Sequence, residues 1–139
     1  MRFLVDTNVI SEVGKGQRCD RNVAAWYRSV ELGRVCLSAL VIGELRAGIE
    51  RLRRRDADRA ARLDRSLVLT AEMFANRIFA VDRRVAEAWG RLSAERRLAA
   101  VDGLIAATAI VHGMIVVTRN VRDFAATGVQ ILNPFEPLQ

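Results

Sequence analysis

Four carboxylates occupy positions that a freely solvated surface acid explains poorly. Asp6 ends the short apolar run Phe3–Val5, and Glu44, Asp102 and Asp123 each stand soon after a predicted strand or at the start of a predicted helix. Gathering carboxylates is unfavourable because they repel one another, so a cluster implies a cation that offsets the charge. Magnesium prefers oxygen ligands and retains waters, which suits a few carboxylates and a substrate phosphate. The four acids therefore predict a magnesium site, provided that the fold brings them together.

Each acid also has an ordinary structural explanation. Asp6 could cap the helical turn that follows it, and Asp102 could cap the apolar helix that it precedes. Asp123 could form an Asx-turn or a cap. Glu44 could be an exposed helix-face residue, although it lies at the edge of an apolar arc beside small residues that would let another segment or a ligand approach. The functional interpretation depends on the convergence of all four positions.

The segments that must position these acids alternate between short apolar runs and helical patterns. This alternation predicts βα units, a mostly parallel sheet of four or five strands and a three-layer α/β/α architecture. Ligands of such sheets lie beyond the carboxyl ends of the strands, where Asp6 and the segment from Thr118 to Asp123 are expected. The predicted strands are residues 3–5, 35–38, 78–81, 115–118 and 129–132, and the predicted helices are residues 24–32, 40–53, 58–75, 81–92 and 103–111.

Length and composition fit one globular domain over residues 1–139, with 51% hydrophobic and 27% charged residues and two prolines. An acid at position 6 argues against a secretory signal, and the apolar stretch 103–117 is too short to span a bilayer. The protein is therefore expected to be soluble and cytoplasmic. Cys19, Cys36 and a single histidine argue against a zinc cage or a disulfide framework.

The net charge of +6 comes almost entirely from arginine, which is densest between residues 46 and 65. Such a stripe could contact a phosphate backbone or an acidic partner. It could equally decorate a solvated helix, because neighbouring acids neutralise part of it and a charge run alone names no partner. The arginines are Arg46, Arg51, Arg53, Arg54, Arg55, Arg59, Arg62 and Arg65, and the acids are Glu50, Asp56, Asp58 and Asp64.

In the segments that carry the four acids, the chain resembles the PIN-domain ribonucleases, and in particular the VapC toxins of bacterial toxin–antitoxin pairs and their FitB-like branch. Any one matching segment is moderately specific, but their order and spacing agree over essentially the whole chain. One departure is Ala99, near a position where the family is expected to have proline. The matching segments are Asp6-Thr7-Asn8-Val9-Ile10-Ser11-Glu12, Gly43-Glu44-Leu45, Asp102-Gly103-Leu104-Ile105-Ala106-Ala107-Thr108-Ala109, Thr118-Arg119-Asn120-Val121-Arg122-Asp123-Phe124 and Asn133-Pro134-Phe135.

The resemblance implies a PIN fold and hydrolysis of RNA phosphodiester bonds at a Mg²⁺ or Mn²⁺ site, with Asp6 and Asp102 anchoring the main ion. It further implies an antitoxin whose tail covers the acidic site, operator DNA bound through that antitoxin, and a homodimer. The implied ligands are Asp6, Glu44, Asp102 and Asp123, and the implied polar support is Asn8, Thr118 and Asn120.

Other enzyme classes fit these residues less well. A phosphohydrolase of the haloacid-dehalogenase kind also begins with an Asp at a strand end, but it needs a second Asp two residues later and a lysine near the site. Here Asn8 stands at that position and Lys15 is the sole lysine. His112 alone argues against histidine-based RNA cleavage or a serine triad. A non-catalytic PIN-like subunit that acts through antitoxin and nucleic-acid binding stays open.

Overall fold

The computed structural model describes residues 1–137, and its centre is a five-stranded sheet in which every pairing is parallel. Residues 138 and 139 of the predicted domain lie outside the described residues. The strands are β1 (Phe3–Val5), β2 (Val35–Ser38), β3 (Ile78–Phe79), β4 (Ile115–Val117) and β5 (Ile131–Leu132), in the spatial order β3-β2-β1-β4-β5. The predicted parallel sheet is confirmed.

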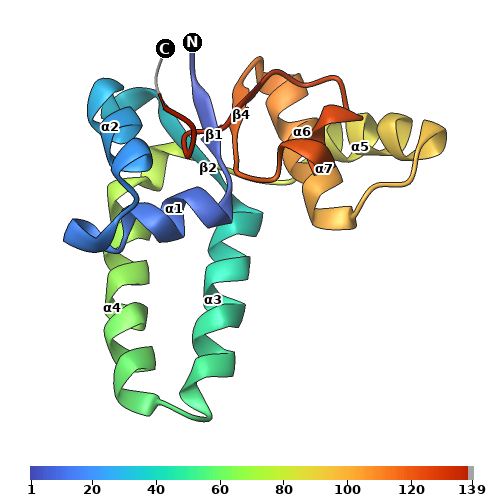
Figure 1. The fold of residues 1–139 in the computed structure, drawn as a ribbon. Helices are drawn as coiled ribbons and strands as arrows, with labels where there is room; N and C mark the ends of the chain where they lie inside the picture. Colours follow the sequence, from blue (N-terminus) through green and yellow to red (C-terminus); the bar gives the residue numbers. More distant parts are fainter. Residues whose placement is uncertain (138–139) are drawn as a thin grey trace.

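Helices cover both faces of this sheet, which confirms the three-layer α/β/α architecture. Figure 1 shows α1 to α4 gathered on one side of the strands and α5 to α7 on the other. Right-handed crossovers require this division, because the chain moves outward from β1 to β3 and then returns past β1 to β4. The helices are α1 (Thr7–Val13), α2 (Arg21–Ser29), α3 (Ala39–Arg53), α4 (Ala57–Met73), α5 (Arg83–Glu95), α6 (Ala100–His112) and α7 (Val121–Ala125).

Two helix starts differ from the sequence prediction by three residues, and the other three differ by one or two. Helix α2 begins three residues earlier than expected, because the Asp20 carboxylate accepts hydrogen bonds from the first-turn amides of Asn22 and Val23. Helix α6 begins at Ala100, so the suggestion that Asp102 is its N-cap is wrong and Asp102 lies in its first turn. The other end of α6 is as predicted, since Gly113 takes a left-handed conformation with φ of 65°.

The core lies between the central strands and the helices on either side. Leu4, Val5 and Val117 are buried in the sheet, and Ile105 and Ala106 of α6 pack against them. Helix α6 is therefore an interior helix, as its apolar sequence predicts. None of the helices in the described part of the chain combines the length and apolar content that a membrane crossing requires.

Helices α3 and α4 form a long hairpin that projects from the sheet (Figure 1). A second, smaller apolar cluster of Ile49, Leu52, Ala60 and Leu67 joins the two helices. The hairpin therefore has a core of its own along its length, apart from the core under the sheet.

Candidate active site

The strand order reverses next to β1, because the chain builds β2 and β3 on one side of β1 and β4 and β5 on the other. At such a switch point, the connections after the two strands leave toward opposite faces and open a crevice at the carboxyl edge. Asp6 directly follows β1 and Thr118 directly follows β4. Both residues therefore stand where an open parallel sheet ordinarily binds its ligand.

Asp6 is held firmly at this edge. Its side chain is only 4% exposed, its Oδ1 accepts a hydrogen bond of 2.8 Å from the amide of Thr7, and its Oδ2 accepts one of 2.8 Å from the hydroxyl of Thr118. Burial raises the pKa of Asp6, the two hydrogen bonds lower it in part, and the charges of Glu44 and Asp123 raise it again. Asp6 also caps α1, so the capping role that its position suggested is confirmed.

The polar residues named from the sequence form a network behind Asp6. Asn8 Nδ2 lies 3.4 Å from both Asp6 Oδ2 and Thr118 Oγ1, and Asn8 Oδ1 accepts a hydrogen bond of 3.2 Å from the amide of Arg119. The backbone amide of Asn120 donates to Thr118 Oγ1 at 3.0 Å. The network joins the start of α1 to the loop after β4, and Asn120 enters it through its backbone.

Glu44 reaches the same edge from the second turn of α3. This helix begins directly after β2 because the hydroxyl of Ser38 caps it. The hydroxyl of Thr7 donates a hydrogen bond of 2.6 Å to Glu44 Oε1, which ties α3 to the residue that follows Asp6. Thr7 had no predicted role, although its position next to a strand-end acid was a usable signal.

Asp102 and Asp123 complete the group of predicted acids. Asp102 is half-buried on α6, and its pKa is raised first by burial and then by the charges of Asp6, Asp123 and Glu44. Asp123 is exposed in the first turn of α7, which begins at Val121. The charges of Glu44 and Asp123 raise the pKa of both Asp6 and Asp102, so carboxylates from four separate elements share one electrostatic environment.

These acids share a space without closing on a common point. Among residues 1–137, no three His, Cys, Asp or Glu side chains form a group that could hold a metal ion as they stand. Charges interact over several ångströms, whereas Mg²⁺–oxygen bonds are about 2 Å long. Magnesium usually binds through one or two carboxylates and fills its other positions with water and phosphate. The residues present therefore fit a hydrated divalent cation rather than a closed protein cage.

A family model for the PIN domain matches residues 3–129 of this chain. The chain belongs to the PIN-domain family. It is 36% identical to VapC ribonuclease Y4jK of Sinorhizobium fredii, over 97% of this chain and 99% of that protein. It is 37% identical to toxin FitB of Neisseria gonorrhoeae, over 96% and 98%.

Solved structures give the same assignment. The crystal structure of FitAcB from Neisseria gonorrhoeae matches this PIN domain with a TM-score of 0.86 and 36% identity, over 96% of this chain and 99% of that chain. The structure of FitAB bound to an IR36 DNA fragment matches with a TM-score of 0.79 and 33% identity, over 99% and 98%. Within the PIN family, the chain therefore falls with the VapC and FitB toxins, as the sequence motifs predicted.

A groove of about 640 Å³ leads away from the candidate site of this PIN domain, between α1, α3 and α4. Thr7 and Glu44 line one end of it, beside Asp6, and most of its basic residues belong to the arginine-rich segment. Its floor is apolar and its rim is basic. The floor contains Leu45, Ile49, Leu52, Leu63 and Leu67, and the rim contains Lys15, Arg18, Arg55, Arg59 and Arg62.

Five arginines of the arginine-rich segment fall into two groups. Arg46 and Arg53 each bind Glu50 within α3 and Asp64 across the α3–α4 hairpin, with N–O distances between 2.9 and 3.0 Å. The rim arginines Arg55, Arg59 and Arg62 form no ion pair with residues 1–137. The charges of Arg46 and Arg53 are therefore neutralised locally, whereas the charges of Arg55, Arg59 and Arg62 make the groove basic.

Proposed function

We propose that this PIN domain is a metal-dependent endoribonuclease of the cytoplasm and the toxin of a toxin–antitoxin pair. The observation that carries the proposal is the gathering of Asp6, Glu44, Asp102 and Asp123 at the switch point of the sheet, where burial and neighbouring carboxylates raise the pKa of two of them. A bound cation would relieve this repulsion. The names of two relatives, a VapC ribonuclease and a toxin, support the same activity.

The four acids are assigned two roles according to how deeply they are buried. Asp6 and Asp102 are the least exposed of the four acids, so they hold the Mg²⁺ or Mn²⁺ ion while Thr7 and Thr118 orient the carboxylate of Asp6. When bound, such an ion supplies a water of lowered pKa and offsets charge on the phosphodiester during in-line attack. Glu44 and Asp123 are exposed and can bind through water or accept a proton from the attacking water.

The proposal includes an antitoxin partner that binds in the groove between α1, α3 and α4, with operator DNA bound through that antitoxin and the toxin as a homodimer. An apolar floor between unpaired arginines fits a helical segment that has one apolar face and acidic flanks. The end of the groove at Thr7 and Glu44 lets a basic side chain of the partner reach the acids. The related FitAB assembly bound to DNA supports this arrangement.

Substituting the two buried acids tests the proposed activity. We expect Asp6→Asn and Asp102→Asn to lower RNA cleavage by about 100-fold or more, because each removes a ligand charge at the reacting centre. Cleavage is measured on purified protein with Mg²⁺ and again after removal of metal by EDTA, which should abolish it. Asp82→Asn is the control, since Asp82 is also an N-cap aspartate, whose carboxylate accepts a hydrogen bond from the amide of Val85 at the start of α5.

Cleavage by both variants at the wild-type rate, or full cleavage in EDTA, would contradict the proposal. Growth arrest on expression separates it from the non-catalytic alternative. Arrest that disappears with Asp6→Asn supports the nuclease, whereas arrest that persists in this variant supports a subunit that acts by binding.

A further inference from the structure

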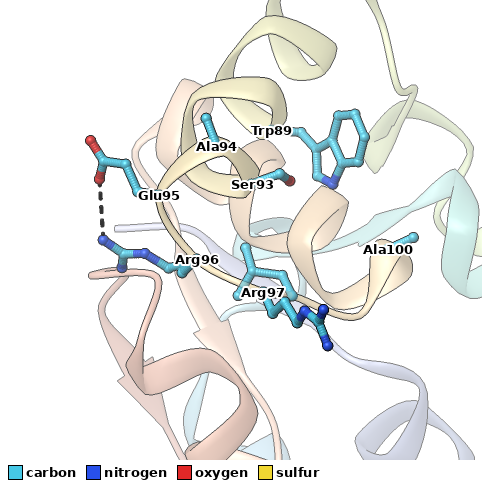
Figure 2. A pocket seen from close by; sticks show the side chains of 8 residues that line it. Trp89, Ser93, Ala94, Glu95, Arg96, Arg97 and Ala100 are labelled. Atoms are coloured by element: carbon cyan, nitrogen blue, oxygen red, sulfur yellow. Dashed lines mark hydrogen bonds and ion pairs between the residues drawn. The ribbon is translucent and has the colours of Figure 1, made fainter.

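The indole of Trp89 on α5 packs onto the first turn of α6, directly beside Asp102. Gly103 is buried there, and a Cβ atom on it would lie 3.0 Å from Trp89 Cδ1 and 3.1 Å from Trp89 Nε1. Figure 2 shows the indole extending from α5 toward the beginning of α6, next to a pocket that Ser93, Arg97 and Ala100 help to line. A residue larger than glycine at position 103 therefore contacts the indole more closely than side chains ordinarily pack, and the indole or α6 must move by a few tenths of an ångström.

Packing rather than hydrogen bonding sets the position of this indole. Trp89 Nε1 is buried and has no hydrogen-bond partner within residues 1–137. A buried donor without a partner is costly and uncommon in folded proteins, so close contact with Gly103 must outweigh the loss. The close contact between Trp89 and Gly103 therefore comes from packing and not from a hydrogen bond of the indole.

Besides the indole, the first turn of α6 is held by Val101, which packs against the core, and by the hydrogen bond from the Gly103 amide to the Ala99 carbonyl. Its N-cap, Ala99, provides no capping side chain, and the carboxylate of Asp102 accepts no hydrogen bond within residues 1–137. Asp6, by contrast, is oriented by hydrogen bonds from two threonines. The place of the Asp102 carboxylate is consequently set by the backbone of this turn, and the turn is set by what packs against it.

We propose that Trp89 and Gly103 are positioning residues for Asp102, and that their contact holds the first turn of α6 at the depth where this carboxylate faces Asp6. The inference rests on the proposed function, because it assigns Asp102 to the metal. Functional side chains must be held within about 0.5 Å of their working geometry. A new contact of 3.0 Å at the neighbouring residue requires a shift of a few tenths of an ångström, which is comparable to this tolerance.

The test compares two glycine-to-alanine variants that differ only in this contact. A Cβ on Gly90, the residue after Trp89, meets nothing within 4 Å, so Gly90→Ala is the matched control for Gly103→Ala. Mn²⁺ affinity is measured by titration calorimetry, and RNA cleavage is measured beside it. We expect Gly103→Ala to weaken Mn²⁺ binding by about ten-fold and to lower kcat with KM unchanged, and Gly90→Ala to match the wild type.

A double-mutant cycle with Asp102→Asn separates positioning from general damage. If Gly103 acts through Asp102, adding Gly103→Ala to Asp102→Asn weakens Mn²⁺ binding no further. Losses that simply multiply would overturn the inference. So would wild-type Mn²⁺ affinity in a folded Gly103→Ala protein.

Trp89→Phe covers the case in which Gly103→Ala does not fold. It keeps an aromatic ring but removes Nε1 and the fused six-membered ring of the indole, so it loosens the packing against Gly103, and we expect a weaker loss of Mn²⁺ affinity in the same direction. Wild-type affinity in this variant would overturn the inference. Failure of the wild type itself to bind Mn²⁺ or cleave RNA would instead overturn the proposed function, and this inference with it.

Discussion

At the scale of single residues, the candidate site contains carboxylates that are unfavourable to one another without a cation. The folded-state pKa of Asp102 is raised by burial and by three neighbouring acids. Because this pKa lies above the unfolded-state value, the folded chain takes up a proton at a higher pH than the unfolded chain does. The metal-free protein therefore gains stability as the pH falls from neutral through the raised pKa, and loses it as the pH rises.

Asp102→Asn should remove this pH-dependent loss. We expect the variant to unfold at a higher temperature than the wild type in EDTA at neutral pH, because the repulsion at that position is gone. Added Mg²⁺ should stabilise the wild type more than the variant, because the proposed site would bind the ion only in the folded protein. Thermal unfolding followed by circular dichroism, with and without Mg²⁺, measures both effects. A wild type that is the more stable protein in EDTA would contradict the assignment.

Thr118 should matter for function through its hydrogen bond to Asp6. Thr118→Val keeps the shape of the side chain but removes the donor to Asp6 Oδ2 and the acceptor for the amide of Asn120. Loss of such a supporting contact typically lowers metal affinity or activity by about 10–100-fold. Thr108→Val is the control, since that hydroxyl is equally buried and bonds only to the backbone of Leu104. Equal RNA cleavage by the two variants would contradict the role of Thr118.

The sequence alone led to the acids but not to all of their supports. Asp6 and Asp102 could be found because their types and their places near element ends are local signals. The contact between Trp89 and Gly103 could not, since it joins two helices whose packing has no pattern in either segment. Thr7 was visible next to Asp6, but its bond to Glu44 spans 37 positions of the chain.

At the scale of elements, the α3–α4 hairpin is held mainly by its apolar seam. Leu67 is 6% exposed in the cluster that joins the two helices, so Leu67→Ala should cost about 2–4 kcal/mol of unfolding free energy. Asp64→Asn should cost a small fraction of that, because its bonds to Arg46 and Arg53 lie at the surface and are screened by solvent. Urea unfolding of both variants measures the ratio, and a larger loss for Asp64→Asn would contradict this view.

Element existence was easier to predict than element ends. Strand β3 was expected over residues 78–81 but stops at Phe79, because its partner β2 ends at Ser38 and enters α3. That limit comes from the neighbouring strand and leaves no mark in residues 80 and 81. The early start of α2 could have been read from Asp20, whose side chain caps it.

At the scale of the whole molecule, the sheet order decides what the local motifs mean. The sequence predicted parallel strands, but the order β3-β2-β1-β4-β5 comes from packing between distant segments. It is this order that sets Asp6 beside Thr118, 112 positions apart, and turns two strand ends into one crevice. The family model matches residues 3–129, and a single domain over residues 1–139 stays a prediction.

The charge of the whole molecule leads to a last prediction, about the groove. The net charge is +6, so every basic residue helps to attract an acidic partner from a distance. A specific contribution of the groove is therefore tested by comparing charge changes inside and outside it. We expect Arg59→Glu with Arg62→Glu, on the rim, to weaken antitoxin binding by about ten-fold or more, mainly through a slower association rate.

Arg83→Glu with Arg84→Glu, at the start of α5, changes the net charge equally but lies outside the groove. Association of the cognate antitoxin with each double variant is measured by surface plasmon resonance at two salt concentrations. The variant with Arg59→Glu and Arg62→Glu should bind the antitoxin more weakly and with less dependence on salt. Its RNA cleavage should be unchanged because the four acids are untouched. Equal losses in the two variants would mean that overall charge, and not the groove, attracts the partner.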